Sequence, residues 1–216
     1  MEKAGNKMIA TYEKSFKKFG VTPSALGCPK GRQQIRFQAF KKLITKDTQL
    51  LDFGCGFGDF VSYLKKNNFP VDYTGCDVMA KFIDVAKKNH SKYRFFKTEV
   101  GEELKENFDI VICSGVFNFL YSKDKVEHFD LVKKTITNLF SISRHSVIID
   151  FLSGNVDFEA DNSYHQKTSQ LIDFCNKEVS RRYIIDHSYM PYEFLIQIFK
   201  DDKIKQIENT FENQIF

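Results

Sequence analysis

Tryptophan is absent from this sequence, proline occurs only four times, and no long apolar run is present. No segment approaches the roughly 20 apolar residues of a membrane-spanning helix, and the N-terminus lacks the apolar core of a secretion signal. The five cysteines form no Cys-x-x-Cys pair, and no two histidines have the spacing of metal ligands. We therefore expect a cytoplasmic protein with reduced thiols, no metal site and no membrane partner.

An excess of one charge is also missing. The 32 Lys and Arg residues are set against 28 Asp and Glu residues, which leaves a net charge of +4 spread along the chain. Basic pairs such as Lys41-Lys42 are usual on solvated helix faces, so no nucleic-acid partner is predicted. A chain of 216 residues can bury the core of one domain, and we expect a monomer or homodimer.

From residue 49 onward, short apolar runs alternate with helical patterns. Strands are predicted over 49–53, 71–76, 93–97, 108–113 and 146–151. Helices are predicted over 59–67, 81–89 and 126–140. Such alternation implies crossover connections, a mostly parallel sheet and helices on both faces.

The last two predicted strands, 182–187 and 192–199, are separated by only four residues. A parallel crossover needs about a dozen residues, so these strands should form an antiparallel hairpin. The expected fold is therefore α/β, with a seven-stranded, mostly parallel sheet and a C-terminal antiparallel hairpin.

The segments outside this rhythm have other predicted roles. Residues 1–45, which include a helical pattern over 32–45, are expected to form an N-terminal helical cap or lid. Residues 46–216 should form the single globular unit. Within it, residues 152–167 are polar and indicate a long loop over the carboxyl edge of the sheet, followed by a helix over 168–178.

A glycine-rich loop, Asp52-Phe53-Gly54-Cys55-Gly56-Phe57-Gly58, follows the first predicted strand and opens a helix. Glycine allows a sharp turn and a close approach to a ligand, and ligands bind at the carboxyl ends of such strands. A dinucleotide fingerprint would need its third glycine where Asp59 stands. Because Asp52 and Asp59 flank the loop, a cationic ligand without phosphate suits it better than a pyrophosphate. A tight turn without a ligand is the plain alternative.

Polar residues also follow the next predicted strands. Asp77 lies 19 residues past Gly58 and could accept both hydroxyls of a ribose, although a turn or helix-capping aspartate would look the same. Glu99 follows the third strand, and Ser114-Gly115 follows the fourth. These positions line the crevice that a parallel sheet forms at its carboxyl edge.

Four segments in this order, 51–58, 73–77, 97–99 and 108–115, resemble the motifs of class I S-adenosylmethionine-dependent methyltransferases. The resemblance covers residues 50–118. It implies a Rossmann-like fold, S-adenosylmethionine as the cofactor and S-adenosylhomocysteine as the product. A NAD-dependent oxidoreductase stays open as an alternative.

The resemblance also implies roles for the cofactor side chains. The methionine amino group would be held by Asp52 and the loop backbone, at Gly54, Cys55, Gly56 and Gly58. Asp77 would bind the ribose hydroxyls, and Val78 and Met79 would cover the adenine. Glu99 or Val100 would meet the adenine amine. Ser114 and Gly115 would supply backbone near the methionine part.

Arg36 begins an Arg-Phe pair that is similar to one in small methyltransferases, where the arginine would fork onto the cofactor carboxylate. A surface arginine on a helix explains it equally. Further along, Gly115-Val116-Phe117-Asn118 resembles a Gly-Val-Phe-Asn signature of small bacterial methyltransferases, some of which serve surface-polysaccharide pathways.

The methyl acceptor is less determined, because methyl transfer needs alignment and only in some cases a base. The substrate-binding candidates are Phe117, Asn118, Tyr121, Ser153 and Tyr12. The candidate catalytic residues are His187, His165 and Tyr164, although ordinary surface or core roles would explain each of them. We expect O- or N-methylation of a small polar metabolite, such as a sugar or surface-polysaccharide precursor. The alternative is a non-catalytic cofactor-binding module or a partner subunit of a methyltransferase complex.

Overall fold

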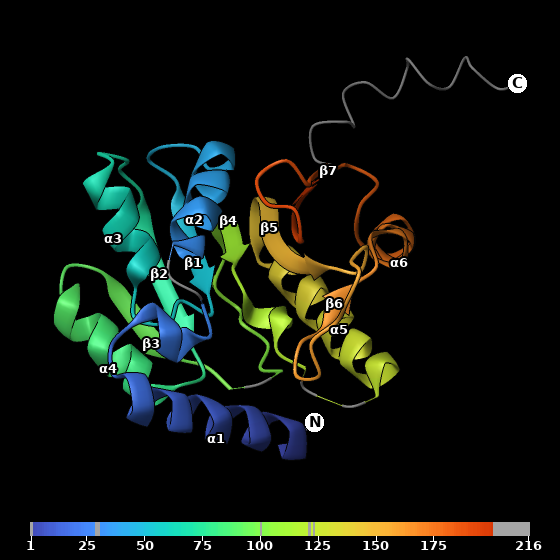
Figure 1. Ribbon diagram of the computed structural model, residues 1–216. Helices are drawn as coiled ribbons and strands as arrows, with labels where there is room; N and C mark the ends of the chain where they lie inside the picture. The colour runs from blue at the N-terminus through green and yellow to red at the C-terminus, as the bar shows by residue number, and fades with distance from the viewer. Residues whose placement is uncertain (1, 29–30, 100, 121, 123, 201–216) are drawn as a thin grey trace, which may run out of the picture.

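The strands form one mixed sheet in the order β3-β2-β1-β4-β5-β8-β7, with β6 pairing beside β5 (Figure 1). The computed structural model describes residues 2–28, 31–99, 101–120, 122 and 124–200. The strands in chain order are β1 (Gln49–Phe53), β2 (Asp72–Asp77), β3 (Arg94–Lys97), β4 (Phe108–Cys113), β5 (Ser143–Ser153), β6 (His165–Gln166), β7 (Tyr183–Asp186) and β8 (Glu193–Phe199).

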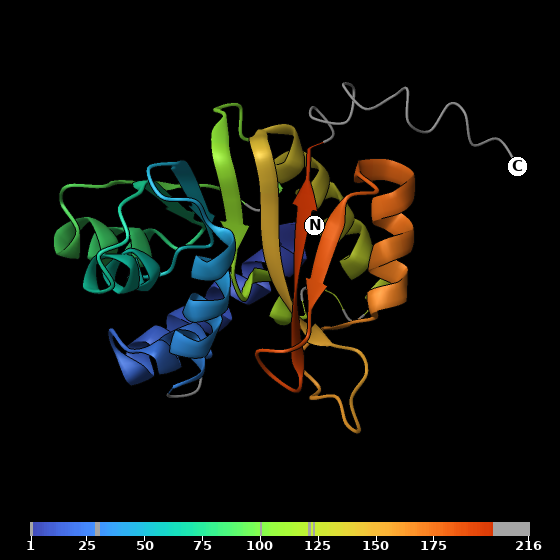
Figure 2. The same ribbon diagram turned by 90° about the horizontal axis from the view of Figure 1, so that it is seen from above.

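Helices cover both faces of this sheet (Figure 2). They are α1 (Glu2–Phe19), α2 (Arg32–Leu43), α3 (Asp59–Lys66), α4 (Ala80–Asn89), α5 (Lys125–Ser141) and α6 (Thr168–Phe174). Three shorter helical segments are the 3-10 turns η1 (Pro23–Leu26) and η2 (Val116–Asn118) and the π-helical turn η3 (Cys175–Val179). Among the described residues, no helix has the length and apolar character that a membrane crossing requires.

Two hydrophobic cores lie on opposite faces of the sheet. Leu51 packs with α5 and α6 on one face, whereas Leu50 packs with α2, α3 and α4 on the other. Both leucines are fully buried, as expected of a central parallel strand covered on both sides. The predicted two-sided α/β architecture is thereby confirmed.

The register of the central strands places three loop openings at one edge. Phe53 at the end of β1 pairs with Cys76 of β2 and with Cys113 of β4, and all three strands are parallel. The segments that follow β1, β2 and β4 therefore leave the sheet side by side.

The predicted C-terminal hairpin is confirmed. β7 and β8 are antiparallel, with Ile184 opposite Gln197, and β8 is also antiparallel to β5. The polar segment 152–167 is not entirely loop, which corrects the sequence prediction. β5 extends to Ser153, and the chain returns beside it as the two-residue strand β6, where the Gly154 N–H donates to the Gln166 carbonyl at 2.8 Å. The predicted seven-stranded sheet is confirmed by the path β3-β2-β1-β4-β5-β8-β7, and within the described residues β6 adds a short eighth strand beside β5.

The N-terminal segment is helical, and α1 lies along the carboxyl edge of the sheet (Figure 1). Aromatic contacts hold α1 there: the Tyr12 ring lies 5.9 Å from Phe82, and the Phe16 ring lies 5.8 Å from Phe57. Phe40 of α2 belongs to the same core as Leu50, so α2 packs as part of the main body. A division of the chain at residue 45 stays a prediction.

Candidate active site

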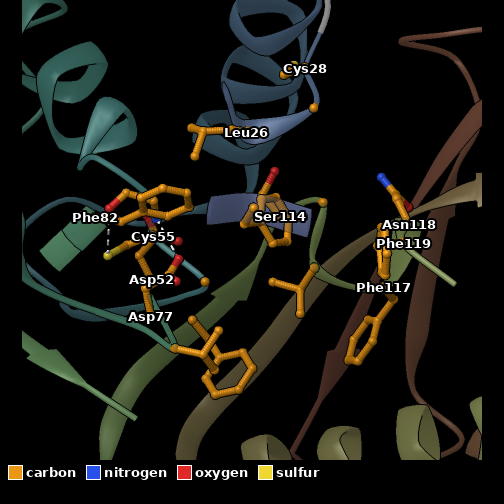
Figure 3. Close-up of a pocket in the computed structure, with 18 of the residues that line it drawn as sticks. Leu26, Cys28, Asp52, Cys55, Asp77, Phe82, Ser114, Phe117, Asn118 and Phe119 are labelled. Carbon is orange, nitrogen blue, oxygen red and sulfur yellow. Dashed lines mark hydrogen bonds between the residues drawn. The ribbon is translucent and has the colours of Figure 1, made fainter. Parts of the chain in front are cut away.

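A cavity of about 460 Å³ lies at the carboxyl edge of β1, β2 and β4, with α1 over it. Figure 3 shows Asp52, Asp77 and Phe82 grouped on one side, Phe117, Asn118 and Phe119 on the other, and Ser114 between them. The first group comes from the glycine loop, β2 and α4, and the second from the segment after β4. We call these sides the acidic half and the polar half.

The glycine loop brings its backbone close to the neighbouring segments. The N–H groups of Gly54 and Cys55 both donate to the Cys76 carbonyl, at 2.8 and 2.9 Å. Gly54 has a φ of +81°, and a Cβ atom at this position would lie 2.2 Å from Cγ2 of Val116. Gly54 is therefore required both by its backbone conformation and by this contact.

Asp77 ends β2 and is held by two backbone groups. Its Oδ2 accepts from the Gly56 N–H at 3.0 Å, and its Oδ1 accepts from the Met79 N–H at 2.8 Å. Burial raises the pKa of Asp77 to about 6, against the opposing effect of these backbone hydrogen bonds. The carboxylate is thus fixed in orientation at the cavity wall.

Asp52, the second acid, is 3% exposed and accepts a hydrogen bond from the Tyr73 hydroxyl at 2.6 Å. Burial raises its pKa to about 7, the Tyr73 hydrogen bond opposes the rise, and the charges of Asp77 and Asp59 add to it. Two desolvated carboxylates in one cavity are stabilised by a cationic ligand and would repel a pyrophosphate. These two carboxylates are hydrogen-bond acceptors, and they fit S-adenosylmethionine, which carries an ammonium group, a sulfonium and ribose hydroxyls.

Four apolar side chains also line the cavity: Phe53, Val78, Val116 and Leu131. Glu99 lines it too, but the Glu99 carboxylate pairs with Lys97. Any contact of Glu99 with an adenine amine would therefore compete with this ion pair. Val100 lies outside the described residues.

Two predicted cofactor residues do not line the cavity. Met79 is buried with Phe57 and Phe82, because its side chain packs into the aromatic cluster under α1. Gly58 caps the N-terminus of α3, and a Cβ atom there would meet His90 at 2.8 Å, so this glycine serves local packing.

Arg36 lines the cavity, but two of its guanidinium nitrogens already donate to a carboxylate of the protein. Nε and Nη2 donate to the two carboxylate oxygens of Glu193 at 2.6 and 2.7 Å, and Nε lies 3.1 Å from Asp150. The remaining Nη1 lies 3.2 Å from where a Cβ of Gly115 would be. The contact of Arg36 with a cofactor carboxylate stays a prediction, and Nη1 is the nitrogen that these ion pairs leave for it.

Three of the predicted substrate residues line the cavity, Phe117 and Asn118 in the polar half and Tyr12 on α1. Asn118 lines the cavity, and its Oδ1 accepts from the Leu152 N–H at 3.0 Å, which turns Nδ2 away from that strand. Phe117 lines the wall and stacks on Phe151, and Tyr12 reaches down from α1. Tyr121 lies outside the described residues.

The predicted catalytic side chains, and Ser153, do not line the cavity. Tyr164 is 4% exposed in the hydrophobic core, with its ring 3.8 Å from that of His128. The His165 Nδ1 bonds to the Ser153 carbonyl, which ties β6 to β5. His187 is exposed, with its ring stacked 5.0 Å from Phe194. These positions follow strand ends in the sequence, but the hairpin and β6 carry them away from the cavity.

Comparisons with known proteins agree with this geometry. The family model described as a methyltransferase domain matches residues 51–138, which contain the glycine loop, Asp77 and the segment after β4. A protein of Mycobacterium tuberculosis, Rv1506c, which is provisionally named a methyltransferase, is 26% identical over 151 residues, covering 69% of this chain and 91% of that protein.

Residues 51–138 therefore match a methyltransferase domain, and the chain has the Rossmann-like fold of S-adenosylmethionine-dependent methyltransferases.

Solved structures share the fold of this methyltransferase. The magnesium protoporphyrin IX methyltransferase of Synechocystis with bound S-adenosylhomocysteine has a TM-score of 0.64 at 15% identity, covering 91% of this chain and 95% of that one. A TehB-like S-adenosylmethionine-dependent methyltransferase from Corynebacterium glutamicum has a TM-score of 0.57 at 18% identity, covering 88% of this chain and 98% of that one.

Among the described residues, no group of three or more His, Cys, Asp or Glu side chains could hold a metal ion.

Several cavity residues of the methyltransferase were not predicted from its sequence. Arg32 lies one helical turn before Arg36, and this spacing was a usable signal. Glu193 does not line the cavity, but it pairs with both arginines, and a charged residue at the start of a mostly apolar strand was a usable signal too. Other unpredicted wall residues are Leu131 and Thr135 on the predicted helix 126–140, and Leu26, Cys28, Asn162 and Ser163 in segments without a clear pattern.

Proposed function

We propose that this methyltransferase transfers a methyl group to an oxygen or nitrogen atom of a small polar metabolite. The observation that carries the proposal is the cavity itself, in which one wall holds two desolvated carboxylates and the opposite wall holds Asn118, Asn162 and Ser163. A concave site of this size, with a few polar groups on an apolar wall, is typical of small-molecule sites.

The acidic half would hold the cofactor. Asp77 would accept hydrogen bonds from the ribose hydroxyls, and Asp52 would face the methionine ammonium. Nη1 of Arg36 would meet the carboxylate. The apolar side chains of Phe53, Val78, Val116 and Leu131 would pack against the adenine, because they line the same cavity as Asp77 and Val78 directly follows Asp77.

When bound, S-adenosylmethionine supplies an electrophilic methyl group that is displaced in line by the acceptor atom. The residues of this chain contribute alignment and the exclusion of water. Tyr12, Met8 and Ser15 of α1 cover the cavity, and burial raises the pKa of Tyr12 to about 12, so its hydroxyl stays protonated. Tyr12 therefore acts as a wall and a hydrogen-bond donor.

The polar half would select the acceptor. Oδ1 of Asn118 is taken by the Leu152 N–H, so Nδ2 would be the atom that donates to an acceptor oxygen. A sugar or a surface-polysaccharide precursor fits such a wall, because its hydroxyls pair with amide and hydroxyl side chains. We propose a small-molecule acceptor, and a monomer or homodimer as the working state.

A thermal-shift and turnover experiment tests this proposal. S-adenosylhomocysteine should raise the melting temperature of the protein, whereas NAD should leave it unchanged. With S-adenosylmethionine and a panel of small polar acceptors, release of homocysteine through a coupling enzyme should report turnover. Stabilisation by NAD alone would contradict the proposal. Cofactor binding without turnover on any acceptor would favour a non-catalytic module or partner subunit.

A further inference from the structure

Two arginines of α2, Arg32 and Arg36, line the cavity on the same face of their helix. They are four residues apart, so their side chains lie one turn from each other. The side chain of Arg36 is 12% exposed, whereas that of Arg32 is 35% exposed, which places Arg32 nearer to solvent. The pair therefore forms an inner and an outer cationic group on one wall.

Both guanidinium groups form ion pairs with buried carboxylates. Oε1 of Glu193 lies 3.0 Å from Nη2 of Arg32 and 2.7 Å from Nη2 of Arg36. Glu193 and Asp150 are fully buried, and neither lines the cavity. The carboxylates thus hold the side chains of two arginines that both line the cavity.

One edge of Arg32 remains available. Its Nη2 is taken by Glu193, and its Nε donates to Sδ of Met190 at 3.4 Å. Within the described part of the chain, Nη1 of Arg32 has no hydrogen-bond partner. An arginine N–H edge of this kind pairs well with a carboxylate oxygen.

The charges of the cluster formed by Arg32, Arg36, Glu193 and Asp150 limit the charge that a ligand can carry. Two guanidinium groups face two carboxylates, so the cluster is close to neutral and has no surplus of positive charge for a dianion. One partly exposed N–H edge matches a single carboxylate better than a phosphate.

From these contacts we infer that Arg32 binds the carboxylate of the methyl acceptor, so that the acceptor is a small organic acid. This inference rests on the proposed function. Arg36, the inner arginine, faces Gly115 and serves the cofactor, whereas Arg32 serves the acceptor. The two arginines therefore divide the two ligands of one reaction between them.

The test uses the full chain loaded with S-adenosylhomocysteine. Calorimetry measures binding of hexuronates, hydroxybenzoates and hydroxy acids, each paired with its neutral amide or alcohol and with a phosphorylated counterpart. At least one acid should bind at least tenfold more tightly than its neutral and phosphorylated counterparts. The same acid should be methylated when S-adenosylmethionine replaces the product.

Variants then assign the effect to Arg32. Arg32→Gln should raise KM for that acid at least tenfold while the affinity for S-adenosylhomocysteine changes less than twofold, and Arg32→Lys should restore part of the loss. Arg144→Gln, which alters an exposed arginine paired with Asp109, is the matched control and should behave as the wild type.

Three results would overturn the inference: no acid binds the loaded protein, neutral or phosphorylated compounds bind as well as the acids, or Arg32→Gln leaves KM unchanged. Failure of S-adenosylhomocysteine to bind the wild type would instead contradict the proposed function, so the two failures are distinguishable.

Discussion

The acidic and polar halves of the cavity are built in different ways. The acidic half comes from elements that are close in the sequence, β1, the glycine loop, β2 and α4, all within residues 49–89. The polar half is assembled from α2, the segment after β4, the loop between β5 and β6, and, behind them, the start of β8. The first half depends on local geometry, whereas the second depends on contacts such as Asn118–Leu152, which joins residues 34 positions apart.

This difference teaches where specificity can change in such a protein. The backbone of the acidic half is fixed by glycines and by the parallel register of β1 and β2, so few substitutions are compatible with it. The polar half uses side chains on loops and on a helix face, which can be exchanged without altering the sheet. Variants in the two halves should therefore have separable effects on cofactor and acceptor.

The largest effect should come from the acidic half, at Gly54. In Gly54→Ala the new Cβ would meet Val116 in a left-handed backbone conformation, so the melting temperature should fall by on the order of 10 °C and cofactor binding should be lost. The control is Gly20→Ala, because Gly20 also has a positive φ, of +61°, but has no atom within 4 Å of a Cβ. Equal losses of stability and cofactor binding in the two variants would contradict the structural role of Gly54.

Asp77→Asn should have the next largest effect. It removes the charge that would bind the ribose hydroxyls, so calorimetry should show roughly 10- to 100-fold weaker binding of S-adenosylhomocysteine. Asp72→Asn, at the exposed start of the same strand, should bind as the wild type. Unchanged affinity in Asp77→Asn would remove this residue from the cofactor site.

The pH dependence of cofactor binding tests whether the Asp52 carboxylate contributes to the cofactor site. Its pKa is raised to about 7, so the ionised form that favours a cationic ligand is lost as the pH falls through 7. Affinity for S-adenosylmethionine should therefore be about tenfold weaker at pH 6 than at pH 8. In Tyr73→Phe the pKa of Asp52 should rise further, because a hydrogen bond that lowers it is removed. The affinity curve should then shift to higher pH, and a flat curve between pH 6 and 8 would exclude Asp52.

A smaller effect is expected in the polar half, at Asn118. Asn118→Ala removes the donor Nδ2, so KM for the acceptor should rise roughly 3- to 10-fold. The affinity for S-adenosylhomocysteine should stay within twofold of the wild type. A loss of cofactor affinity equal to the rise in KM would show that the two halves are not separable.

The smallest effects are expected for the histidines outside the cavity. His187→Ala and His165→Gln should leave kcat and KM near the wild-type values, because neither side chain lines the cavity. A decrease of kcat by tenfold or more in either variant would restore that histidine as a catalytic candidate.

The sequence carried enough information to predict the acidic half and most of the sheet. Asp52 and Asp77 follow strands with clear apolar patterns, and the short connection before β8 required an antiparallel hairpin. β6 could not be predicted, because two residues have no periodicity. The role of Glu193 could not be predicted, because it depends on partners in α2 that are distant in the sequence. The predicted catalytic roles rest only on residue type and on position after strands for Tyr164, His165 and His187. Neither property shows where a side chain points.

A crystal structure of the protein with S-adenosylhomocysteine tests the central claim most directly. The ligand should lie under α1 with its ribose hydroxyls on Asp77 and its ammonium group near Asp52. Ligand density elsewhere in the molecule, with the glycine loop from Gly54 to Gly58 free of contacts, would contradict it.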